Sequence, residues 1–511
     1  MAASRKRRRR KPLDAAVMAA QDVFGPRARA HATVPLLDTD SVERIHQASL
    51  KLLRNTGLRV LHSKAREIMK AHGADVNEAT QMVHFDSELI ESSLKTIPKQ
   101  FTLHARNPSH SVVLGNDSMV NAVVASAPNC SDMEAGRRTG NRQDFQNFLR
   151  LGQYHNILHV FGGYPVEPVD IHASIRHLDC ISDLLTLTDK AFCIYSLGEQ
   201  RVLDAIEMTR IGHGISVNEL KNKPCLFTVI NTNSPLQLDI PMMQGVYDMA
   251  RHGQPVVITP FTLAGAMAPV TLAGAITLQN AEALATLAFS QMVNPGAPAM
   301  YGGFTSNVDM KSGSPAFGTP EYIKAQLISG QLARRYGIPF RTSNVCAANT
   351  VDAQAAYEST ISLWGAVNSG GHLLMHGAGW LEGGLCASFE KFVLDVDLLQ
   401  MINEMQKTVS VSEEDLALDA IAEVGPGGHF FGVEHTQKRY RSAFYSPVIS
   451  DWRNFESWQE SGSPTAIEKA NKEWKKRLSL YEQPFMEETR LDELNEFVNR
   501  RKSEGGVATD F

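Results

Sequence analysis

Four aromatic side chains stand where the chain could bind a small cation. Phe261, Tyr301, Phe304 and Trp380 each lie at the end of a short apolar run, next to polar residues or glycines. Aromatic faces attract cations that cannot donate hydrogen bonds, by about 0.5–2 kcal/mol per ring, and quaternary ammonium is the usual ligand of this kind. Each ring taken alone is more often part of a core, but the four together favour a cage for a cation.

The polar side chains that follow the same kind of run are mostly neutral. They include Asn231, Asn233, Asn344, Asn349, His376 and Glu382. None of these positions carries a lysine suited to Schiff-base chemistry, and together they do not supply three His, Asp or Glu ligands for a metal ion. The pattern predicts a binding site with few charges and no metal of its own.

Glycine pairs occur at the same places, at Gly162-Gly163, Gly302-Gly303 and Gly383-Gly384. Backbone without a side chain lets a large ligand approach closely, but it also forms tight turns. The sequence leaves both interpretations open.

Eight short β-rich runs position these residues. They start near residues 119, 156, 190, 224, 255, 297, 338 and 371, so successive runs begin 31 to 42 residues apart. Each run is almost entirely apolar at its start, as in strands that are buried on both faces of a sheet.

The stretches between the runs have the periodicity of helices. Ser234-Pro235 and Thr319-Pro320 each place a capping residue before a proline, which is typical of a helix start. They predict helices over 236–253 and 319–337, and the same periodicity predicts two more over 352–370 and 388–405.

Eight strand–helix units at near-constant spacing predict an α/β fold, a (β/α)8 TIM barrel, because neighbouring parallel strands need a helical crossover. The alternative is an open doubly wound sheet, which usually carries a glycine-rich phosphate loop after its first strand. The first run here ends in ASAPNC, which is not such a loop. In a barrel, the loops that follow the strands build the active site, and the residues singled out above lie on those loops.

We expect four segments along the chain. These are a basic, unfolded tail (1–34), an N-terminal α+β elaboration (35–118), the barrel (119–410) and a helical C-terminal extension packed on the barrel (411–511). The elaboration should hold a helix over 41–57 and two short strands within 101–115. No segment outside the barrel has the pattern of a further domain with its own core.

Charge is distributed unevenly. All residues from Arg5 to Lys11 are basic, so the rest of the chain is more acidic than the net charge of −5 suggests. An acidic body argues against nucleic-acid binding, which needs a basic face to neutralise phosphates. The basic run could tether the protein to nucleic acid or to a membrane, but we interpret it as an unfolded tail because like-charge blocks resist folding.

Three features predict a cytoplasmic protein without membrane spans. The N-terminus lacks the apolar core of a secretory signal, and the six cysteines are scattered, with no CxxC pair. Residues 254–281 carry no charge, but they contain three prolines that would be costly in a membrane helix. We expect a buried strand, a loop and a buried helix there.

At these residues the chain resembles the trimethylamine:corrinoid methyltransferase family, particularly its members without pyrrolysine, which include glycine betaine methyltransferases. The similarity spans about 35–450. The matching stretches are INTNSPLQ (230–237), PVVITPFTLAGAMAPVTLAGA (255–275), MYGGFTSNVDMKSG (300–313), GTPEYIKAQ (318–326), VDAQAAYES (351–359), LLMHGAGWLEGGLCASFEKFVLD (373–395) and GPGGHFFG (425–432).

The resemblance implies a barrel enzyme that moves a methyl group from a methylated amine to the Co(I) of a corrinoid (cobalamin) carried by a cognate partner protein. The family places pyrrolysine shortly before the DAQA stretch, and Asn349 stands at the corresponding position here. A quaternary ammonium leaves as a neutral tertiary amine, whereas a tertiary amine first needs activation, the role proposed for pyrrolysine. An ordinary residue at position 349 favours a quaternary substrate such as glycine betaine. The main task of the protein is then to position this substrate and to exclude water from it.

The resemblance also implies roles for the residues above. The four aromatic rings would surround the ammonium, and Asn231, Asn233 and Asn349 would orient a carboxylate. The catalytic candidates, which would hydrogen-bond the substrate or the corrinoid, are His376, Glu382 and Asn349. The glycines expected to let the corrinoid approach are Gly302, Gly303 and Gly383.

Other interpretations stay open. The amine could be tertiary, like trimethylamine, or the acceptor could be free cobalamin or a folate. The chain could instead be a non-catalytic binder of betaines or of corrinoid proteins. A metal-dependent hydrolase or lyase fits less well, because no ligand cluster is visible. We also expect a homo-oligomer.

Overall fold

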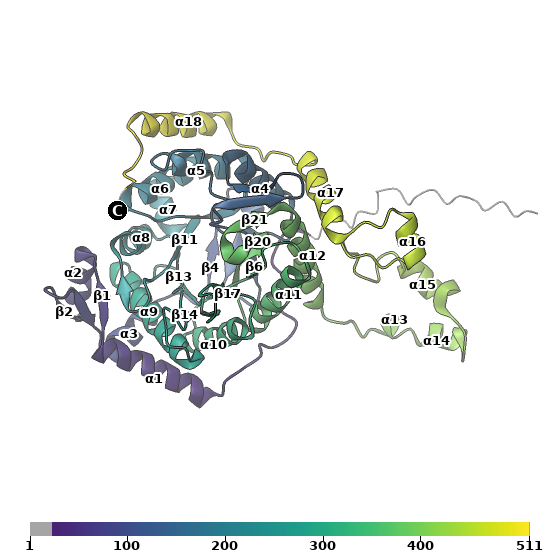
Figure 1. The fold of residues 1–511 in the computed structure, drawn as a ribbon, viewed down its shortest axis with the longest axis horizontal. Coiled ribbons are helices and arrows are strands. Elements are labelled where there is room, and N and C mark those ends of the chain that lie inside the picture. Colours follow the sequence, from purple (N-terminus) through teal and green to yellow (C-terminus); the bar gives the residue numbers. More distant parts are fainter. Residues whose placement is uncertain (1–22, 510–511) are drawn as a thin grey trace, which may run out of the picture.

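The computed structural model describes residues 23–509, and the basic run Arg5–Lys11 lies outside them. Its centre is a closed barrel of eight parallel strands, which follow one another around the barrel in sequence order (Figure 1). The strands are β6 (Val120–Val123), β9 (Val160–Phe161), β10 (Ala191–Ile194), β11 (Leu226–Ile230), β13 (Val256–Ile258), β15 (Ala299–Gly302), β18 (Phe340–Ser343) and β19 (Leu373–Ala378). The predicted barrel is confirmed, with one strand in each of the eight predicted runs.

A ring of helices surrounds the barrel, because each parallel strand is followed by a helical crossover (Figure 1). The crossover helices are α4 (Arg142–Tyr154), α5 (Arg176–Leu187), α6 (Glu199–His213), α8 (Ile240–Arg251), α9 (Leu272–Val293), α10 (Pro320–Tyr336), α11 (Ala353–Asn368) and α12 (Phe389–Met405). A short helix, α7 (Val217–Asn222), follows α6.

The two predicted helix starts differ in outcome. The hydroxyl of Thr319 accepts a hydrogen bond from the backbone N–H of Tyr322, and Pro320 begins α10 as expected. Ser234-Pro235 does not begin a helix, because Asp239 caps α8 instead. The Ser234 hydroxyl donates to the carboxylate of Glu282 in α9, so this dipeptide anchors a loop to the helix layer.

The uncharged stretch 254–281 forms a buried strand, a loop and the start of a buried helix, as predicted. The strand is β13, the loop contains β14 (Leu263–Ala264), and the helix is α9. α9 is apolar nearly all round because α1 (Thr39–Asn55) and α3 (Ser87–Leu94) cover its outer side. Among residues 23–509, no helix is long and apolar enough to cross a membrane.

The N-terminal segment closes the barrel at the amino ends of its strands. β4 (Phe101–Leu103) and β5 (Val112–Leu114) form an antiparallel hairpin whose apolar side chains join the core inside the barrel. Beside the barrel, β12 (Gln237–Leu238) extends a small sheet of N-terminal strands. The remaining elements here are β1 (Leu58–Val60), α2 (Ser63–Ala71), β2 (Asp75–Asn77) and β3 (Met82–His84).

Short strands border the opposite end, where the barrel strands have their carboxyl ends. One sheet joins the loops that follow β6 and β19, and it consists of β7 (Asn129–Asp132), β8 (Gly136–Thr139), β20 (Trp380–Leu381) and β21 (Cys386–Ser388). A second sheet joins β14 to β16 (Ser306–Val308) and β17 (Pro315–Ala316).

The C-terminal extension packs on the barrel only in part. α17 (Ala466–Ser479) lies against α12 and α4, and α18 (Glu488–Ser503) lies against α5 and α6. Figure 1 shows the segment before them extending away from the barrel. It contains α13 (Glu413–Leu416), α14 (Leu418–Val424), α15 (Glu434–Arg439) and α16 (Phe455–Glu460).

Candidate active site

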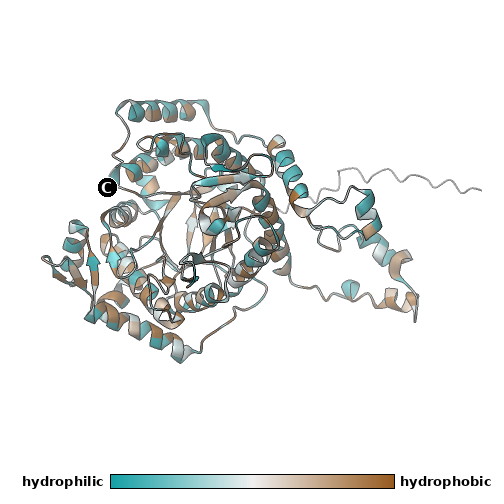
Figure 2. Cartoon of the chain, in the orientation of Figure 1, coloured by the Kyte–Doolittle hydropathy of each residue, from teal (hydrophilic) through white to brown (hydrophobic). Residues whose placement is uncertain are grey.

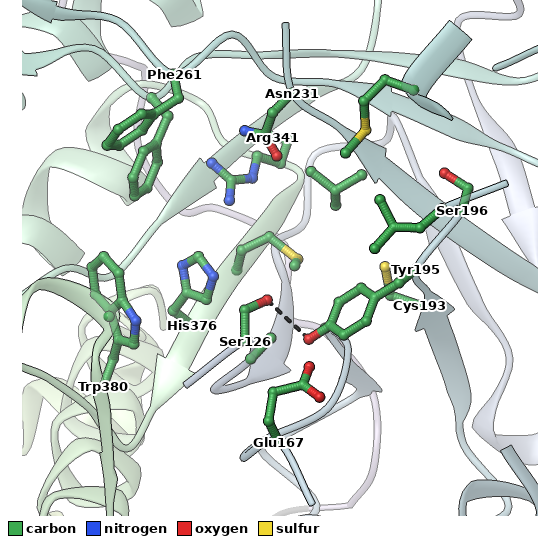
Figure 3. A pocket seen from close by; sticks show the side chains of 18 residues that line it. Ser126, Glu167, Cys193, Tyr195, Ser196, Asn231, Phe261, Arg341, His376 and Trp380 are labelled. Atoms are coloured by element: carbon green, nitrogen blue, oxygen red, sulfur yellow. Dashed lines mark hydrogen bonds between the residues drawn. The ribbon is translucent and has the colours of Figure 1, made fainter. Parts of the chain in front are cut away.

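A cavity of about 410 Å³ lies at the carboxyl ends of the barrel strands (Figure 3). Its volume is within the range of small-molecule sites, and this end of a TIM barrel is where active sites are built. All eight barrel strands, or the loops that follow them, contribute to its lining. The lining residues are Ala125, Ser126, Gly162, Glu167, Cys193, Tyr195, Ser196, Leu197, Val229, Asn231, Met242, Phe261, Phe304, Arg341, Met375, His376, Trp380 and Gly384.

Three of the four aromatic residues singled out in the sequence line this cavity together. Phe261 and Phe304 come from the loops after β13 and β15, and Trp380 belongs to β20. The ring centroids of Phe261 and Phe304 lie 5.4 Å apart, and those of Phe304 and Trp380 lie 6.0 Å apart. At these distances the rings form one aromatic wall, and Figure 3 shows Phe261 and Trp380 on the same side of the cavity.

Tyr301 does not line the cavity, contrary to the expectation from the sequence. Successive side chains of a strand point to opposite faces. In β15, Met300 belongs to the core inside the barrel, whereas Tyr301 packs in the layer between barrel and helices. Its hydroxyl donates to Oδ1 of Asn280 in α9 at 3.0 Å. Tyr301 therefore joins the barrel to its helix layer.

His376 reaches the cavity through an irregularity in β19. The pairing of β19 with β6 shifts register between Leu374 and Ala378, and His376 itself has a φ of 56°. Its ring stacks on Trp380, with centroids 4.7 Å and planes 11° apart. Burial, with Arg341 nearby, lowers the pKa of His376 well below its usual value, so the ring is neutral. Bulges and strained residues of this kind cluster at functional sites.

Arg341 places a buried guanidinium in the wall of the cavity. It belongs to β18, and its Cζ lies 5.1 Å from the ring centroid of Phe304. Burial lowers the pKa of Arg341 to about 10, which leaves the group charged at neutral pH. Within residues 23–509, its Nε and Nη1 have no hydrogen-bond partner, nor does Nδ1 of His376. A guanidinium in the lining of a cavity suits a carboxylate, because the group can donate two parallel hydrogen bonds to it.

Glu167 supplies the opposite charge. It lies on the loop after β9, and Figure 3 shows it well away from Arg341. Burial raises the pKa of Glu167, and the guanidinium of Arg176 at 3.4 Å opposes this shift. Arg341 and Glu167 are the two Asp, Glu, Lys or Arg side chains in the lining. The cavity therefore has one cationic and one anionic position, a pattern that suits a zwitterion.

Tyr195 and Ser126 form a hydrogen-bonded pair beside Glu167 (Figure 3). The two hydroxyl oxygens lie 2.9 Å apart, and the backbone N–H of Tyr164 donates to the Tyr195 hydroxyl at 3.2 Å. Burial raises the pKa of Tyr195 well above its usual value, so it is a neutral phenol. Ser126 has a φ of 68°, a second strained residue in the lining.

The three asparagines expected to bind substrate take different positions. Asn231 lines the cavity, and its Nδ2 donates to the backbone oxygen of Thr259 at 2.9 Å. Asn233 instead pairs with Asp239, exchanging hydrogen bonds of 3.1 and 3.0 Å with the residue that caps α8. Asn349 is exposed on the loop after β18 and is not part of the lining. Only Asn231 is placed to touch a ligand in this cavity.

Glu382 lies outside the lining. Both oxygens of its carboxylate accept hydrogen bonds from Nε of Arg137 at 3.0 Å. Its backbone N–H donates to the oxygen of Ala348 at 3.0 Å. Glu382 thus ties together the loops at the mouth of the barrel and does not face the cavity.

The glycines expected to admit a corrinoid are packed against protein. A Cβ on Gly302 would lie 2.1 Å from Oγ1 of Thr259, and one on Gly303 would meet side chains of the helix layer at 2.7 Å. Gly383 has a φ of 62° and turns the chain after β20. At these three positions the backbone packs closely against other parts of the same chain. In the loop after β20, the glycine that lines the cavity is Gly384.

Three polar groups of the site, Arg341, Glu167 and Tyr195, were not predicted. Arg341 left a signal, because a charged residue within the buried run IPFRTSNV needs a special partner. Tyr195 directly follows the third strand, so its position alone could have marked it. Glu167 comes several residues after β9, and only the path of the loop brings it back to the cavity.

Comparison with known proteins places the chain in a family. The profile of the family described as trimethylamine methyltransferase (MTTB) matches residues 3–506. The chain belongs to the trimethylamine methyltransferase family. A relative, the glycine betaine methyltransferase of Desulfitobacterium hafniense (strain Y51), is 35% identical over 472 residues and covers 92% of this chain and 98% of its own. The family resemblance inferred from the sequence is confirmed.

A second relative from the trimethylamine methyltransferase family is less similar. Trimethylamine methyltransferase MttB1 of Methanosarcina mazei is 30% identical over 437 residues, covering 84% of this chain and 87% of its own. Among solved structures, the hydroxylamine complex of MtmB aligns over 89% of this chain and 97% of that chain, with a TM-score of 0.49 and 11% identity. That structural likeness is too low to bear on function.

Proposed function

We propose that this member of the trimethylamine methyltransferase family demethylates a quaternary amine that carries a carboxylate, such as glycine betaine. The observation that carries the proposal is the guanidinium of Arg341, which is the one Lys or Arg side chain in the lining of the cavity. A buried charge without an opposite charge beside it is costly, and a substrate carboxylate in the cavity would supply that charge. Trimethylamine has no such group.

The other end of the substrate is a trimethylammonium group. The aromatic wall of Phe261, Phe304 and Trp380 offers it ring faces, and Glu167 offers it negative charge. A tertiary amine without a carboxylate would carry its positive charge into a cavity that already holds a buried arginine. The proposal is also in line with the 35% identity to a glycine betaine methyltransferase.

In this proposal the second substrate is a corrinoid carried by a partner protein, whose Co(I) attacks the methyl carbon in line. As the cobalt–carbon bond forms, the carbon–nitrogen bond breaks and its electron pair stays on nitrogen. The departing tertiary amine is neutral, so no acid is needed. His376 is neutral and could donate a hydrogen bond to the carboxylate. The chain acts by holding the substrate and excluding water, and a Co(I) acceptor fits the reducing cytoplasm expected from the sequence.

The test compares ligands and variants by calorimetry. We expect Arg341→Met to weaken glycine betaine binding by roughly 10- to 100-fold, because charge-assisted hydrogen bonds are lost. Choline has the same ammonium but no carboxylate, so its binding should not weaken. Arg54→Met, which removes an exposed arginine of α1, is the matched control.

Turnover is followed as methyl-cobalt absorbance after mixing with Co(I) cobalamin and methylated amines. Equal binding of glycine betaine by wild type and Arg341→Met would contradict the proposed substrate. Tight betaine binding with no methyl transfer, even when the corrinoid protein is supplied, would instead indicate a non-catalytic binder.

A further inference from the structure

Two neighbouring loops at the open end of the barrel carry the same dipeptide. Phe261-Thr262 follows β13, and Phe304-Thr305 follows β15, the adjacent parallel strand. Both phenylalanines line the cavity, whereas both threonines are buried and are not part of the lining. The repeated dipeptide thus places a hydroxyl group directly after each of two rings of the aromatic wall.

The two threonines join the loops to each other. Their hydroxyl groups form a hydrogen bond, and the backbone N–H of Ser306 donates to the backbone oxygen of Thr262 at 3.2 Å. Directly after the threonines, β14 and β16 pair as parallel strands. The loops are therefore held at a fixed separation, and the ring centroids of Phe261 and Phe304 lie 5.4 Å apart.

A buried glutamine of α9 ends this chain of hydrogen bonds. The Thr305 hydroxyl donates to Oε1 of Gln279 at 2.7 Å. Because that hydroxyl has one proton, its bond with Thr262 is one that it accepts. Nε2 of Gln279 donates to Oγ of Ser329 at 2.9 Å and to the Tyr301 hydroxyl at 3.3 Å. Figure 2 shows hydrophobic residues along most of the barrel strands, and a buried amide in such surroundings needs partners of this kind.

Gln279 also packs against the backbone beside Phe304. A Cβ on Gly303 would lie 2.9 Å from Nε2 of Gln279, so the loop rests directly on this amide. Phe304 is the central ring of the wall, because its centroid lies 6.0 Å from that of Trp380 and 5.1 Å from Cζ of Arg341. A displacement of this one loop would therefore disturb the whole wall.

We propose that Gln279 is a positioning residue for substrate binding, which acts through the Thr262–Thr305 hydrogen bond to hold the two phenylalanine rings. Cation–π attraction requires the ammonium over a ring face, within about 6 Å of the centroid, so the orientation of the rings decides its strength. This role rests on the proposed function, because it requires that the aromatic wall binds an ammonium group. Arg341 then binds the carboxylate, and Gln279 fixes the place of the ammonium.

The test compares affinities for glycine betaine and choline by calorimetry. Thr305→Val replaces the hydroxyl by a methyl group, and Gln279→Leu removes the amide that holds it. We expect each variant to weaken both ligands by roughly 2- to 30-fold, the contribution of one ring. Arg341→Met should weaken glycine betaine alone. Thr305→Ser keeps the hydroxyl and should bind both ligands as wild type does.

Two other buried residues of α9 serve as matched controls. The Thr286 hydroxyl donates to the backbone oxygen of Glu282 within the helix at 2.9 Å. Nε2 of Gln291 donates to the oxygen of Ala297 at 3.0 Å, in the turn that precedes β15. Thr286→Val and Gln291→Leu should lower the thermal unfolding temperature without changing the affinity for either ligand.

A neutral ligand separates ring orientation from general loss of packing. 3,3-Dimethylbutanol has the shape of choline, with carbon in place of the charged nitrogen. Misplaced rings lose cation–π attraction, so the ratio of the choline affinity to the 3,3-dimethylbutanol affinity should fall in Thr305→Val and stay unchanged in Thr305→Ser. An equal loss of affinity for both ligands in Thr305→Val would overturn the positioning role.

Phe304→Leu distinguishes failure of this role from failure of the proposed function. If Phe304→Leu weakens choline but Thr305→Val does not, the wall binds the ammonium and the positioning role is wrong. An unchanged choline affinity in Phe304→Leu would overturn both. Should Gln279→Leu fail to fold, Thr305→Val and Thr305→Ser decide the outcome at the other end of the same hydrogen bond.

Discussion

Two side chains, Arg341 and Glu167, place opposite charges at separate positions of a mostly apolar cavity. Charges interact strongly where water is excluded, so a ligand that carries only one charge meets one favourable and one unfavourable group. A zwitterion can satisfy both. At the scale of the residue, this pair distinguishes a betaine from a simple amine, and the aromatic wall alone does not.

Glu167 should make ligand binding depend on pH. Burial raises its pKa above the usual value, so acidification protonates it earlier than an exposed glutamate. We expect the affinity for glycine betaine to fall as the pH drops through this raised pKa, because the negative charge near the ammonium is lost. Calorimetry between about pH 8 and pH 5 measures the trend.

The other groups that face Glu167 do not share this behaviour. Burial raises the pKa of the Tyr195 hydroxyl further from neutrality, and Arg341, elsewhere in the lining, stays charged. Glu167→Gln should therefore bind with little pH dependence across the same range, whereas Glu67→Gln on the exposed side of α2 should behave like wild type. A Glu167→Gln variant with the wild-type pH profile would rule out this role.

At the scale of the element, the loops after the strands are held in place by the helix layer. The β11–α8 loop carries Asn231, and it is bound by a single carboxylate of α9. Glu282 accepts hydrogen bonds from the hydroxyls of Thr232 and Ser234 and from the backbone N–H of Leu236. This helix therefore positions one side of the cavity as well as covering β13 and β15.

Removing that carboxylate should loosen the loop. We expect Glu282→Ala to lower the free energy of unfolding by roughly 2–4 kcal/mol, because it leaves buried donors without a partner. Urea unfolding followed by circular dichroism measures the change. Glu67→Ala, at an exposed position of α2, should stay within about 0.5 kcal/mol of wild type. An equal loss in both variants would show that Glu282 contributes nothing beyond a surface glutamate.

At the scale of the whole molecule, several histidines are buried as neutral groups. Burial lowers the pKa of His155 and of His159 to about 3. Both ring nitrogens of His155 lack a hydrogen-bond partner among the described residues. Between about pH 6.5 and pH 3 the unfolded chain takes up protons on these rings that the folded chain does not, so stability falls as the pH falls.

We expect the free energy of unfolding to decrease steadily as the pH falls below about 6.5. Replacing one such ring, in His155→Leu, should reduce this slope by up to about 1.4 kcal/mol per pH unit, the value for one proton. Urea midpoints measured across this range test the change. His31→Leu, at an exposed position, should keep the wild-type slope, and an unchanged slope in His155→Leu would contradict the prediction.

The sequence by itself determined the eight strands, most of the crossover helices and the end of the barrel that carries the site. These follow from local patterns, because a buried parallel strand needs an apolar run and each crossover needs a helix. Phe261, Phe304, Trp380 and His376 could be placed near one another by the same logic, since loops after parallel strands meet at one end.

Only the tertiary structure decided which way the side chains point and which groups meet. In β15 the side chain of Met300 points into the barrel, and that of Tyr301, one residue later, points to the opposite face. Asn349 and Glu382 follow their strands too, but neither side chain lines the cavity. The contact of Arg341 with the aromatic wall and its separation from Glu167 depend on how β18 lies relative to the segments that follow β9, β13, β15 and β19. Burial sets the charges and pKa values of these groups, and it arises only when the whole barrel is assembled, so no single segment of the sequence predicts it.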